Sequence, residues 1–237
     1  MDLITIAGDL SASVEKLKFG PPVFHVYNPL DYAWPSHRTY LERYGGNGRE
    51  IVLVGMNPGP WGMVQTGVPF GDVVMVRDWL DIHAPVARPA KEHPARPIQG
   101  FDCRRREVSG KRLWGWAKAT YGTPERFFDR FFVFNYCPLA FMEESGRNLT
   151  PDRLPAEMRE PLIELCDASL KKVVECLEPR YVLGVGRFAE RRVNAALADM
   201  DLTTGMVPHP SPANPAANQG WGEAMSRALA AVGIQLP

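Results

Sequence analysis

Three polar side chains stand where the sequence could support chemistry. Asn57 lies in the stretch "GMNPGPWGMVQTGVPFG", Asn135 closes an apolar run of four residues, and His209 is flanked by prolines in "HPSPANP". An amide both donates and accepts hydrogen bonds, and a histidine ring nitrogen can donate one to a ligand. Each residue also has a plainer interpretation: Asn57 as a turn former, Asn135 as a buried amide with internal partners, and His209 as a core or surface histidine.

The surrounding pattern predicts how these residues are positioned. Short apolar runs alternate with segments of helical periodicity, which is typical of a parallel sheet with helices on both faces. The expected strands are 51–54, 131–134, 181–185 and 203–207. The expected helices are a short one within residues 1–20, then 37–46, 109–119 with Ser109 as its cap, 154–177, 187–200 and 217–231.

The sequence therefore predicts an α/β fold: a three-layer α/β/α single domain, residues 1–237, with a central, mainly parallel four-stranded sheet. Residues 84–97 hold four prolines and are expected to form a surface loop. In such sheets ligands bind beyond the carboxyl ends of the strands. The loop from Gly55 to Gly71, Asn135, Gly186 and His209 should consequently converge there.

Composition restricts the classes of function. The chain has 237 residues, and 27 basic side chains balance 27 acidic ones, so any contact with nucleic acid must come from local patches such as Arg104–Arg106. That patch could equally be a solvated basic turn. The four cysteines form no C-x-x-C pair, and we predict no metal. No apolar run is long enough for a membrane span, so an intracellular protein with reduced thiols is expected.

The segment "GVGRFA", residues 184–189, matches the dinucleotide fingerprint in part. The segment about twenty residues further on lacks the acidic residue that would bond a ribose hydroxyl. A tight turn between strand and helix is the favoured interpretation, and a nucleotide-dependent Rossmann enzyme is the alternative.

The motifs "GMNPGPWGMVQTGVPFG", "NYCPL", "SGRNLTP" and "HPSPANP" occur in an order and spacing that resemble the single-strand-selective monofunctional uracil-DNA glycosylases, from about Ile51 to Trp221. This resemblance implies an enzyme of base excision repair that hydrolyses the N-glycosidic bond of uracil in DNA, prefers single strands and needs no cofactor. It also implies a DNA-binding protein, taken here as a monomer, in the cytoplasm or nucleoid of a bacterium or the nucleus of a eukaryote. The alternative is a non-catalytic module that binds damaged bases or single-stranded DNA.

The resemblance also assigns roles. Asn57 would orient the attacking water, His209 would donate to uracil O2, Asn135 would read the base edge and Phe70 would stack on the base. Gly62 is expected to leave an unfilled space beside C5 that admits 5-hydroxymethyluracil and rejects thymine, unless it only permits a turn. The further residues expected at the base are Met56, Gly59 and Met63, and those expected at DNA are Ser109, Lys111, Arg112, Arg147, Ser211, Pro212, Ala213 and Asn214.

One of these positions departs from the family pattern. Relatives often carry arginine after the second proline of His-Pro-Ser-Pro, where this chain has Ala213. Alanine is too small to fill the gap that an extruded nucleotide leaves in a duplex. Weak activity on duplex DNA is therefore expected unless Asn214 or Asn218 substitutes.

Overall fold

The computed structural model describes residues 1–237 apart from the side chain of Ala216. Its main sheet has the four parallel strands that were predicted, and their order is β3-β2-β6-β7. The strands are β2 (Ile51–Gly55), β3 (Phe131–Asn135), β6 (Tyr181–Val185) and β7 (Thr203–Val207). Because the strands are parallel and in register, Gly55 pairs with Asn135 and Val185 with Val207, so all four run to the same edge.

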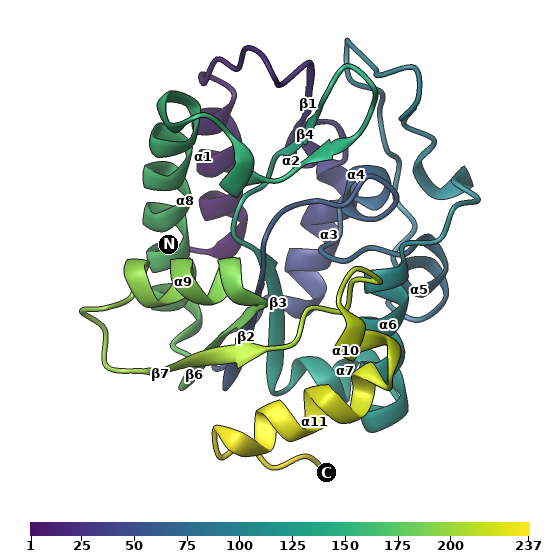
Figure 1. The fold of residues 1–237 in the computed structure, drawn as a ribbon. Helices are drawn as coiled ribbons and strands as arrows, with labels where there is room; N and C mark the ends of the chain where they lie inside the picture. The colour runs from purple at the N-terminus through teal and green to yellow at the C-terminus, as the bar shows by residue number, and fades with distance from the viewer.

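Two sets of helices cover the sheet. The crossover from β2 to β3 carries α6 (Val108–Tyr121) and α7 (Pro124–Phe128), and those to β6 and β7 carry α8 (Ala156–Leu177) and α9 (Arg187–Ala196). Since β3 and β6 flank β2 on opposite sides, right-handed crossovers put these two pairs on opposite faces. In Figure 1, α8 and α9 lie on one side, with α1 (Leu3–Val14) against α8, and α6, α7 and α11 (Trp221–Ala231) lie on the other.

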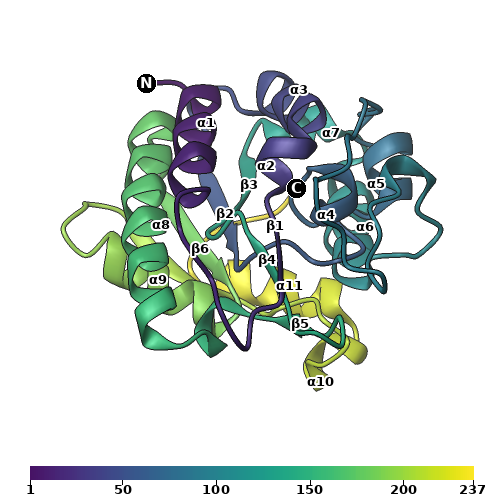
Figure 2. The same ribbon diagram turned by 90° about the horizontal axis from the view of Figure 1, so that it is seen from above.

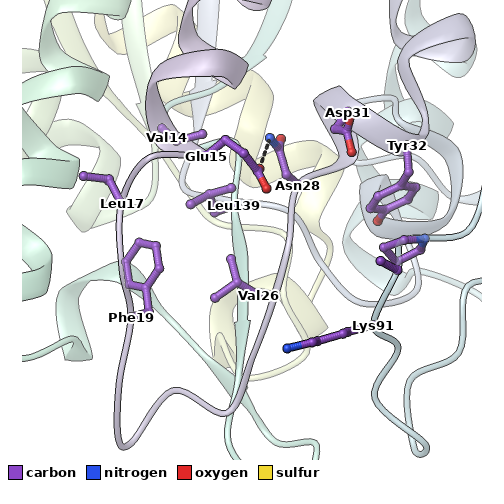
Figure 3. Close-up of a pocket in the computed structure, with 12 residues that line it drawn as sticks. Val14, Glu15, Leu17, Phe19, Val26, Asn28, Asp31, Tyr32, Lys91 and Leu139 are labelled. Atoms are coloured by element: carbon purple, nitrogen blue, oxygen red, sulfur yellow. Dashed lines mark hydrogen bonds between the residues drawn. The ribbon is translucent and has the colours of Figure 1, made fainter.

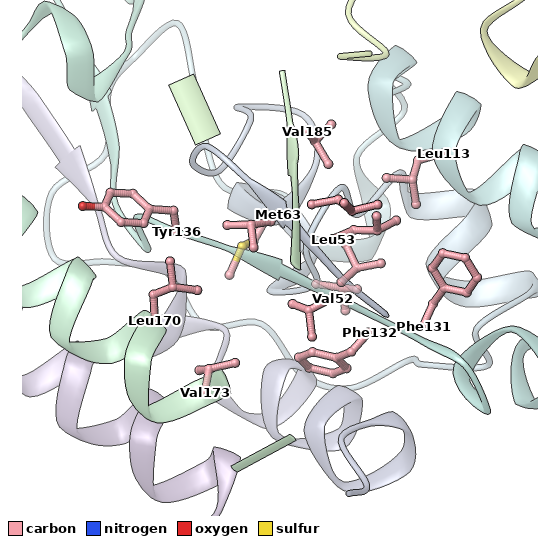
Figure 4. Close-up of a cluster of buried hydrophobic side chains, with 14 of the residues drawn as sticks. Val52, Leu53, Met63, Leu113, Phe131, Phe132, Tyr136, Leu170, Val173 and Val185 are labelled. Atoms are coloured by element: carbon pink, nitrogen blue, oxygen red, sulfur yellow. The ribbon is translucent and has the colours of Figure 1, made fainter. Parts of the chain in front are cut away.

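The core fills the space between sheet and helices. Figure 4 shows side chains of the strands, including Val52 and Phe132, together with Leu113 from α6 and Leu170 from α8. Every residue of β2 is buried, as expected for a central strand whose two faces are both covered. The apolar runs that predicted the strands are thus the same residues that hold the sheet between its helices.

A second, antiparallel sheet of three strands was not predicted. It consists of β1 (His25–Tyr27), β4 (Ala140–Met142) and β5 (Asn148–Leu149), in the order β1-β4-β5 (Figure 2). Strands of two or three residues are too short to show an alternating pattern in the sequence. This sheet matters for function, because β5 lies in the "SGRNLTP" motif.

Several predicted helix boundaries were wrong. The helix expected at 37–46 spans 34–44, and the one expected at 187–200 ends at Ala196. Helix α6 begins at Val108, its N-cap is Glu107, and Ser109 lies inside its first turn. The last helical segment is divided into α10 (Pro215–Asn218) and α11, because Gly220 adopts a φ of +116° between them. The remaining helices are α2 (Pro29–Tyr32), α3 (Trp34–Tyr44), α4 (Met63–Thr66), α5 (Val73–Asp78) and the 3-10 turns Gly100–Asp102 and Pro151–Arg153.

Residues 84–97 contain only a single bridge, between His93 and Arg96, and otherwise no helix or strand, as predicted. Within the described chain, no helix has both the length and the apolar character to cross a membrane.

Candidate active site

A cavity of about 370 Å³ lies at the carboxyl ends of the strands and gathers the predicted motifs. Its polar wall brings together Asn57 from the loop after β2, Asn135 from the end of β3 and His209 from the loop after β7. The predicted convergence of these loops is therefore confirmed. The cavity is lined by Met56, Asn57, Pro58, Gly59, Pro60, Gly62, Met63, Phe70, Glu107, Ser109, Asn135, Asn148, Thr150, His209 and Ser211.

Asn57 is held by one end of its amide. Its Nδ2 donates a hydrogen bond of 3.1 Å to the carbonyl oxygen of Leu139. This bond fixes which branch of the amide is nitrogen, and it leaves Oδ1, which can only accept, for a ligand or water in the cavity. An acceptor in a fixed position can orient a water without removing its proton.

His209 is set up as a hydrogen-bond donor. Its Nδ1 accepts from the backbone N–H of Ser211 at 3.0 Å, so the neutral ring carries its proton on Nε2. Burial of the ring lowers the pKa of His209 below the ordinary value of 6.5 and favours that neutral form. Both observations favour the neutral ring with its proton on Nε2, a question that the sequence left open.

The loop that carries His209 is fixed by side chains that donate to its carbonyl oxygens. Trp221 Nε1 donates to Pro208 at 2.8 Å and Asn214 Nδ2 to His209 at 2.9 Å. Arg112 Nη1 donates to Pro210 O at 2.8 Å, and Asn218 Nδ2 donates to Pro212 O at 3.0 Å. Since prolines offer no N–H for a backbone ladder, these side chains supply the bonds that order the loop.

Asn135 is oriented by Met63. Its Nδ2 lies 3.2 Å from Met63 Sδ, which is an acceptor only, so the amide oxygen takes the opposite branch. The backbone beyond β3 continues to pair with the neighbouring strand: Tyr136 N donates to Gly55 O and Cys137 N to Met56 O, each at 2.9 Å. Asn135 therefore occupies a rigid position, and Met63 is the neighbour that selects its orientation.

Phe70 has a strained backbone that its surroundings hold in place. Its φ is +53°, a conformation that residues other than glycine rarely adopt. Its carbonyl oxygen accepts from Trp114 Nε1 at 3.0 Å and from Asp72 N at 2.8 Å, and a Cβ at Gly110 would come within 1.9 Å of it. The ring is 6.3 Å from His209 at an angle of 48°. The contacts that hold this backbone conformation thus keep the Phe70 ring in the cavity.

Sequence reasoning missed Glu107, which forms part of the cavity wall. Burial, and secondarily the charge of Asp72, raises the pKa of its carboxyl. The backbone N–H of Glu107 donates to Asp72 Oδ2 at 3.1 Å. Asp72 is itself buried and accepts from Arg106 Nε at 2.8 Å and from Arg106 Nη2 at 2.7 Å. Arg106 belongs to the basic run noticed in the sequence, but its role in the structure is to hold this turn.

Asn148 and Thr150 are also cavity residues that the sequence did not single out, although they lie in the quoted "SGRNLTP" motif. Asn148 Oδ1 is buried and has no hydrogen-bond partner within the described chain. The strand β5 that carries it is too short to be read from the sequence, and the motif was the one signal that could have indicated it.

Glu107 occupies the side of Gly62 from which a side chain would project, while Gly62 itself lines the cavity. A Cβ at Gly62 would lie 2.8 Å from Glu107 Cγ, and one at Gly59 would lie 2.7 Å from Glu107 Oε2. Both glycines therefore admit the side chain of Glu107 against the loop. A larger residue at either position would push that carboxyl away before it reached a base.

The residues expected at DNA fall into three groups. Lys111 and Arg147 are exposed and available, whereas Arg112 is bonded to Pro210 and to Asn218 Oδ1, so it positions the histidine loop. Ser109 is buried in the cavity wall. The loop residues are Ser211, which lines the cavity, Pro212 and Ala213, which are exposed, and Asn214, which bonds His209.

The glycines of "GVGRFA" are explained by packing. A Cβ at Gly184 would lie 2.1 Å from the backbone nitrogen of Glu190, and Gly186 has a φ of +87° with His209 Cβ 3.1 Å from its own Cβ position. The tight turn lets α9 approach β6 and leaves room for His209. A pyrophosphate is not needed to account for these glycines.

A second cavity, of about 420 Å³, lies between α1, α2 and β1 (Figure 3). Asn28 and Glu15 face each other in it and form a hydrogen bond of 3.3 Å, with Leu139 close by. Among the described side chains no group of three His, Cys, Asp or Glu is placed to hold a metal ion.

A family model described as the uracil DNA glycosylase superfamily matches residues 43–231. The chain belongs to the uracil DNA glycosylase superfamily. The match covers the whole strand-end cavity, from the loop after β2 to the loop after β7, and α11 beyond it.

Relatives of this superfamily member have been named for their activity. The chain is 48% identical to the single-strand selective monofunctional uracil DNA glycosylase of Mus musculus and 49% identical to that of Rattus norvegicus. Each match covers 95% of this chain, and 81% and 82% of the relatives. A crystal structure of wild-type SMUG2 from Pedobacter heparinus shares the fold, with a TM-score of 0.66 and 17% identity over 96% of this chain and 97% of that one.

Proposed function

We propose that this superfamily member hydrolyses the N-glycosidic bond of uracil in DNA, preferring single strands, and leaves the strand intact. The observation that carries the proposal is the presence in one cavity of an acceptor, a donor, an oriented amide and an aromatic face, from Asn57, His209, Asn135 and Phe70. The relatives named as single-strand selective monofunctional uracil-DNA glycosylases support the same reaction.

The reaction follows from the atoms of these groups that the internal hydrogen bonds leave available to a ligand. A water held by Asn57 Oδ1 bonds to the anomeric carbon as the bond to N1 breaks, and the electron pair of that bond leaves with the base. His209 Nε2–H donates to uracil O2, where negative charge gathers, and a preorganised donor of this kind contributes roughly two to three orders of magnitude in rate. A neutral amide is a weak base, so the proton of the water passes to solvent after the bond has formed.

Base choice is assigned to Asn135. With Nδ2 turned to Met63 Sδ, its Oδ1 accepts from uracil N3–H, and the second hydrogen of Nδ2 donates to O4. Cytosine presents the opposite pattern on this edge and would leave both groups mismatched. Phe70 stacks on the base face and contributes roughly 1–3 kcal/mol without regard to base identity.

The preference for single strands follows from the cost of taking a base out of a duplex. Ala213 is exposed and too small to fill the gap in a duplex. Lys111 and Arg147 are available for phosphates, and the protein is proposed to act as a monomer on DNA inside the cell, without cofactor or metal. No lysine is among the described residues that line the cavity, which favours water over an amine as nucleophile.

The alternative is a module that binds damaged bases without turnover. Incubation with a single-stranded oligonucleotide that contains one uracil, followed by alkali, separates the two, because only an enzyme produces an alkali-labile site. The same oligonucleotide with thymine is the control. No cleavage after alkali would favour the binding module, and a protein–DNA adduct trapped by borohydride would contradict hydrolysis by water.

A further inference from the structure

Trp61 lies on the rim of the strand-end cavity. Its chain neighbours Pro60 and Gly62 both line the cavity, whereas Trp61 is partly exposed and is not among the described residues that line it. Two guanidinium groups lie close to its ring: Cζ of Arg105 is 4.5 Å from the ring centroid, and Cζ of Arg96 is 5.1 Å from it. These three residues, which we call the rim cluster, bring two positive charges to the edge of the cavity.

Buried hydrogen bonds fix the loops that carry the rim cluster. The side chain of Gln65 is buried, and its Nε2 donates to Pro60 O and to Pro97 O, each at 3.1 Å. This one amide therefore joins the loop after β2 to the proline-rich surface loop, beside the ring and the first guanidinium. On the other side, the pair between Arg106 and the buried Asp72 holds the basic turn. The rim cluster is thus assembled by contacts within the protein.

The two guanidinium groups of the rim cluster lack an acidic partner. Within the described chain, neither Arg96 nor Arg105 forms an ion pair with a carboxylate. Nη1 of Arg96 donates to Ala95 O at 2.8 Å, its Nε is buried without a partner, and Arg105 is exposed. Two like charges beside one ring repel each other, and an anion between them would remove that repulsion. The cluster therefore favours an anionic ligand.

We propose that the rim cluster binds one phosphodiester of the DNA strand next to the uracil, with the Trp61 ring holding both guanidinium groups in place. The inference rests on the proposed function, because a base in the cavity requires the backbone to leave over the rim. A phosphodiester offers two unesterified oxygens, and these match the paired N–H groups of an arginine. The cluster thus fixes the path of the strand and makes no contact with the base.

The same geometry divides the basic run Arg104–Arg106, which the sequence could not resolve. Arg106 is bonded to Asp72 and holds the turn, and Arg105 approaches Trp61. Arg104 is exposed and, within the described chain, makes neither an ion pair nor a ring contact. Removal of the same charge one residue away is therefore a matched control for Arg105.

The test is excision from single-stranded oligonucleotides in which one linkage near the uracil is an uncharged methylphosphonate, moved one position at a time. At protein concentrations below saturation, one position should stand out for the wild type, with a rate about tenfold lower. Arg105→Ala should lower the rate on the unmodified strand by a similar factor. The methylphosphonate at that position should then cost little more, because its partner is already gone.

Two variants show which part of the rim cluster is needed. Arg104→Ala should keep the effect of the sensitive linkage, since its guanidinium lies outside the cluster. Trp61→Leu should reduce that effect, because both guanidinium groups lose the ring that positions them, and a general loss of folding would not depend on the linkage. Equal losses at every linkage, or a sensitive linkage that persists in Arg105→Ala, would overturn the proposal.

Binding without turnover separates this proposal from the proposed function. Fluorescence anisotropy with a labelled single strand of thymine nucleotides gives the binding constant at several salt concentrations. Each phosphate contact with a single strand contributes about 0.7 to the slope of log K against log salt, so Arg105→Ala should lower the slope by about that amount and Arg104→Ala should not. A wild type that excises nothing but shows this difference would overturn the proposed function alone. Equal slopes for the two variants would overturn the role of the rim cluster, whatever the enzyme does.

Discussion

Two cavities meet at Leu139, and they differ in how their polar groups are held. The carbonyl oxygen of Leu139 fixes Asn57 in the strand-end cavity, while the residue also lines the larger cavity of Figure 3. In the larger cavity Glu15, Asp31 and Lys91 are exposed. The buried Asn28 there has both ends of its amide bonded internally, Nδ2 to Ser11 and Glu15 and Oδ1 to the N–H of Leu30.

In the strand-end cavity Asn57, His209 and Asn135 each use one side of the side chain for an internal bond and keep the other for a ligand. The two cavities are similar in volume. What marks the strand-end cavity as a binding site is that its polar side chains are fixed by one hydrogen bond and keep their other donor or acceptor for a ligand.

The largest loss of uracil excision is expected from Asn57→Ala, in the strand-end cavity. Loss of a group that positions water or stabilises charge should lower single-turnover uracil excision by at least about a hundredfold. The thermal midpoint should change little, since Asn57 is partly exposed and makes a single hydrogen bond to Leu139. Excision at the wild-type rate would show that Asn57 is only a turn former and would remove the contrast between the cavities.

The protonation of His209 gives a second test, through pH. Burial lowers its pKa below 6.5, and the functional form is the neutral one, so excision should be level above pH 6.5. It should fall by about tenfold per pH unit once the pH drops below the lowered pKa. The single-turnover rate measured from pH 4.5 to 8 checks this, and a rate that rises on acidification would mean that the imidazolium is the active form.

Support of the histidine loop should have a smaller effect. Trp221→Phe removes the donor to Pro208 O but keeps an aromatic ring in a buried position. The loss of one buried hydrogen bond costs about 1–3 kcal/mol of stability, and excision should fall roughly threefold to tenfold as the loop loosens. Lowered kcat with an unchanged KM would support positioning; an unaffected kcat would mean that the other three side-chain donors suffice.

The smallest effect on excision is expected from Phe19→Ala, on the wall of the larger cavity. Phe19 packs on Phe141 at 5.0 Å, so truncation should lower the free energy of unfolding by about 1–3 kcal/mol. Uracil excision should stay within about twofold of the wild type at a temperature where both are folded. A large loss of excision would mean that the two cavities are coupled through Leu139.

Much of the strand-end cavity could be predicted from the sequence, and some of it could not. The buried runs before Asn57 and Asn135 indicated parallel strands, and parallel strands bring their ends together whatever their separation in the chain. Glu107 was missed because it follows a basic turn, not a strand, and enters the cavity only through its bond to Asp72. The protonation of His209 depends on Ser211 N, a backbone geometry that composition does not encode.

The most direct test is a crystal structure of the protein with uracil and a single-stranded abasic oligonucleotide. The account predicts uracil in the strand-end cavity, stacked on Phe70, with O2 within hydrogen-bond distance of His209 Nε2 and the N3–O4 edge on the amide of Asn135. Uracil bound in the cavity beside Phe19 and Asn28, or bound at the strand ends with its O2 turned away from His209, would contradict it.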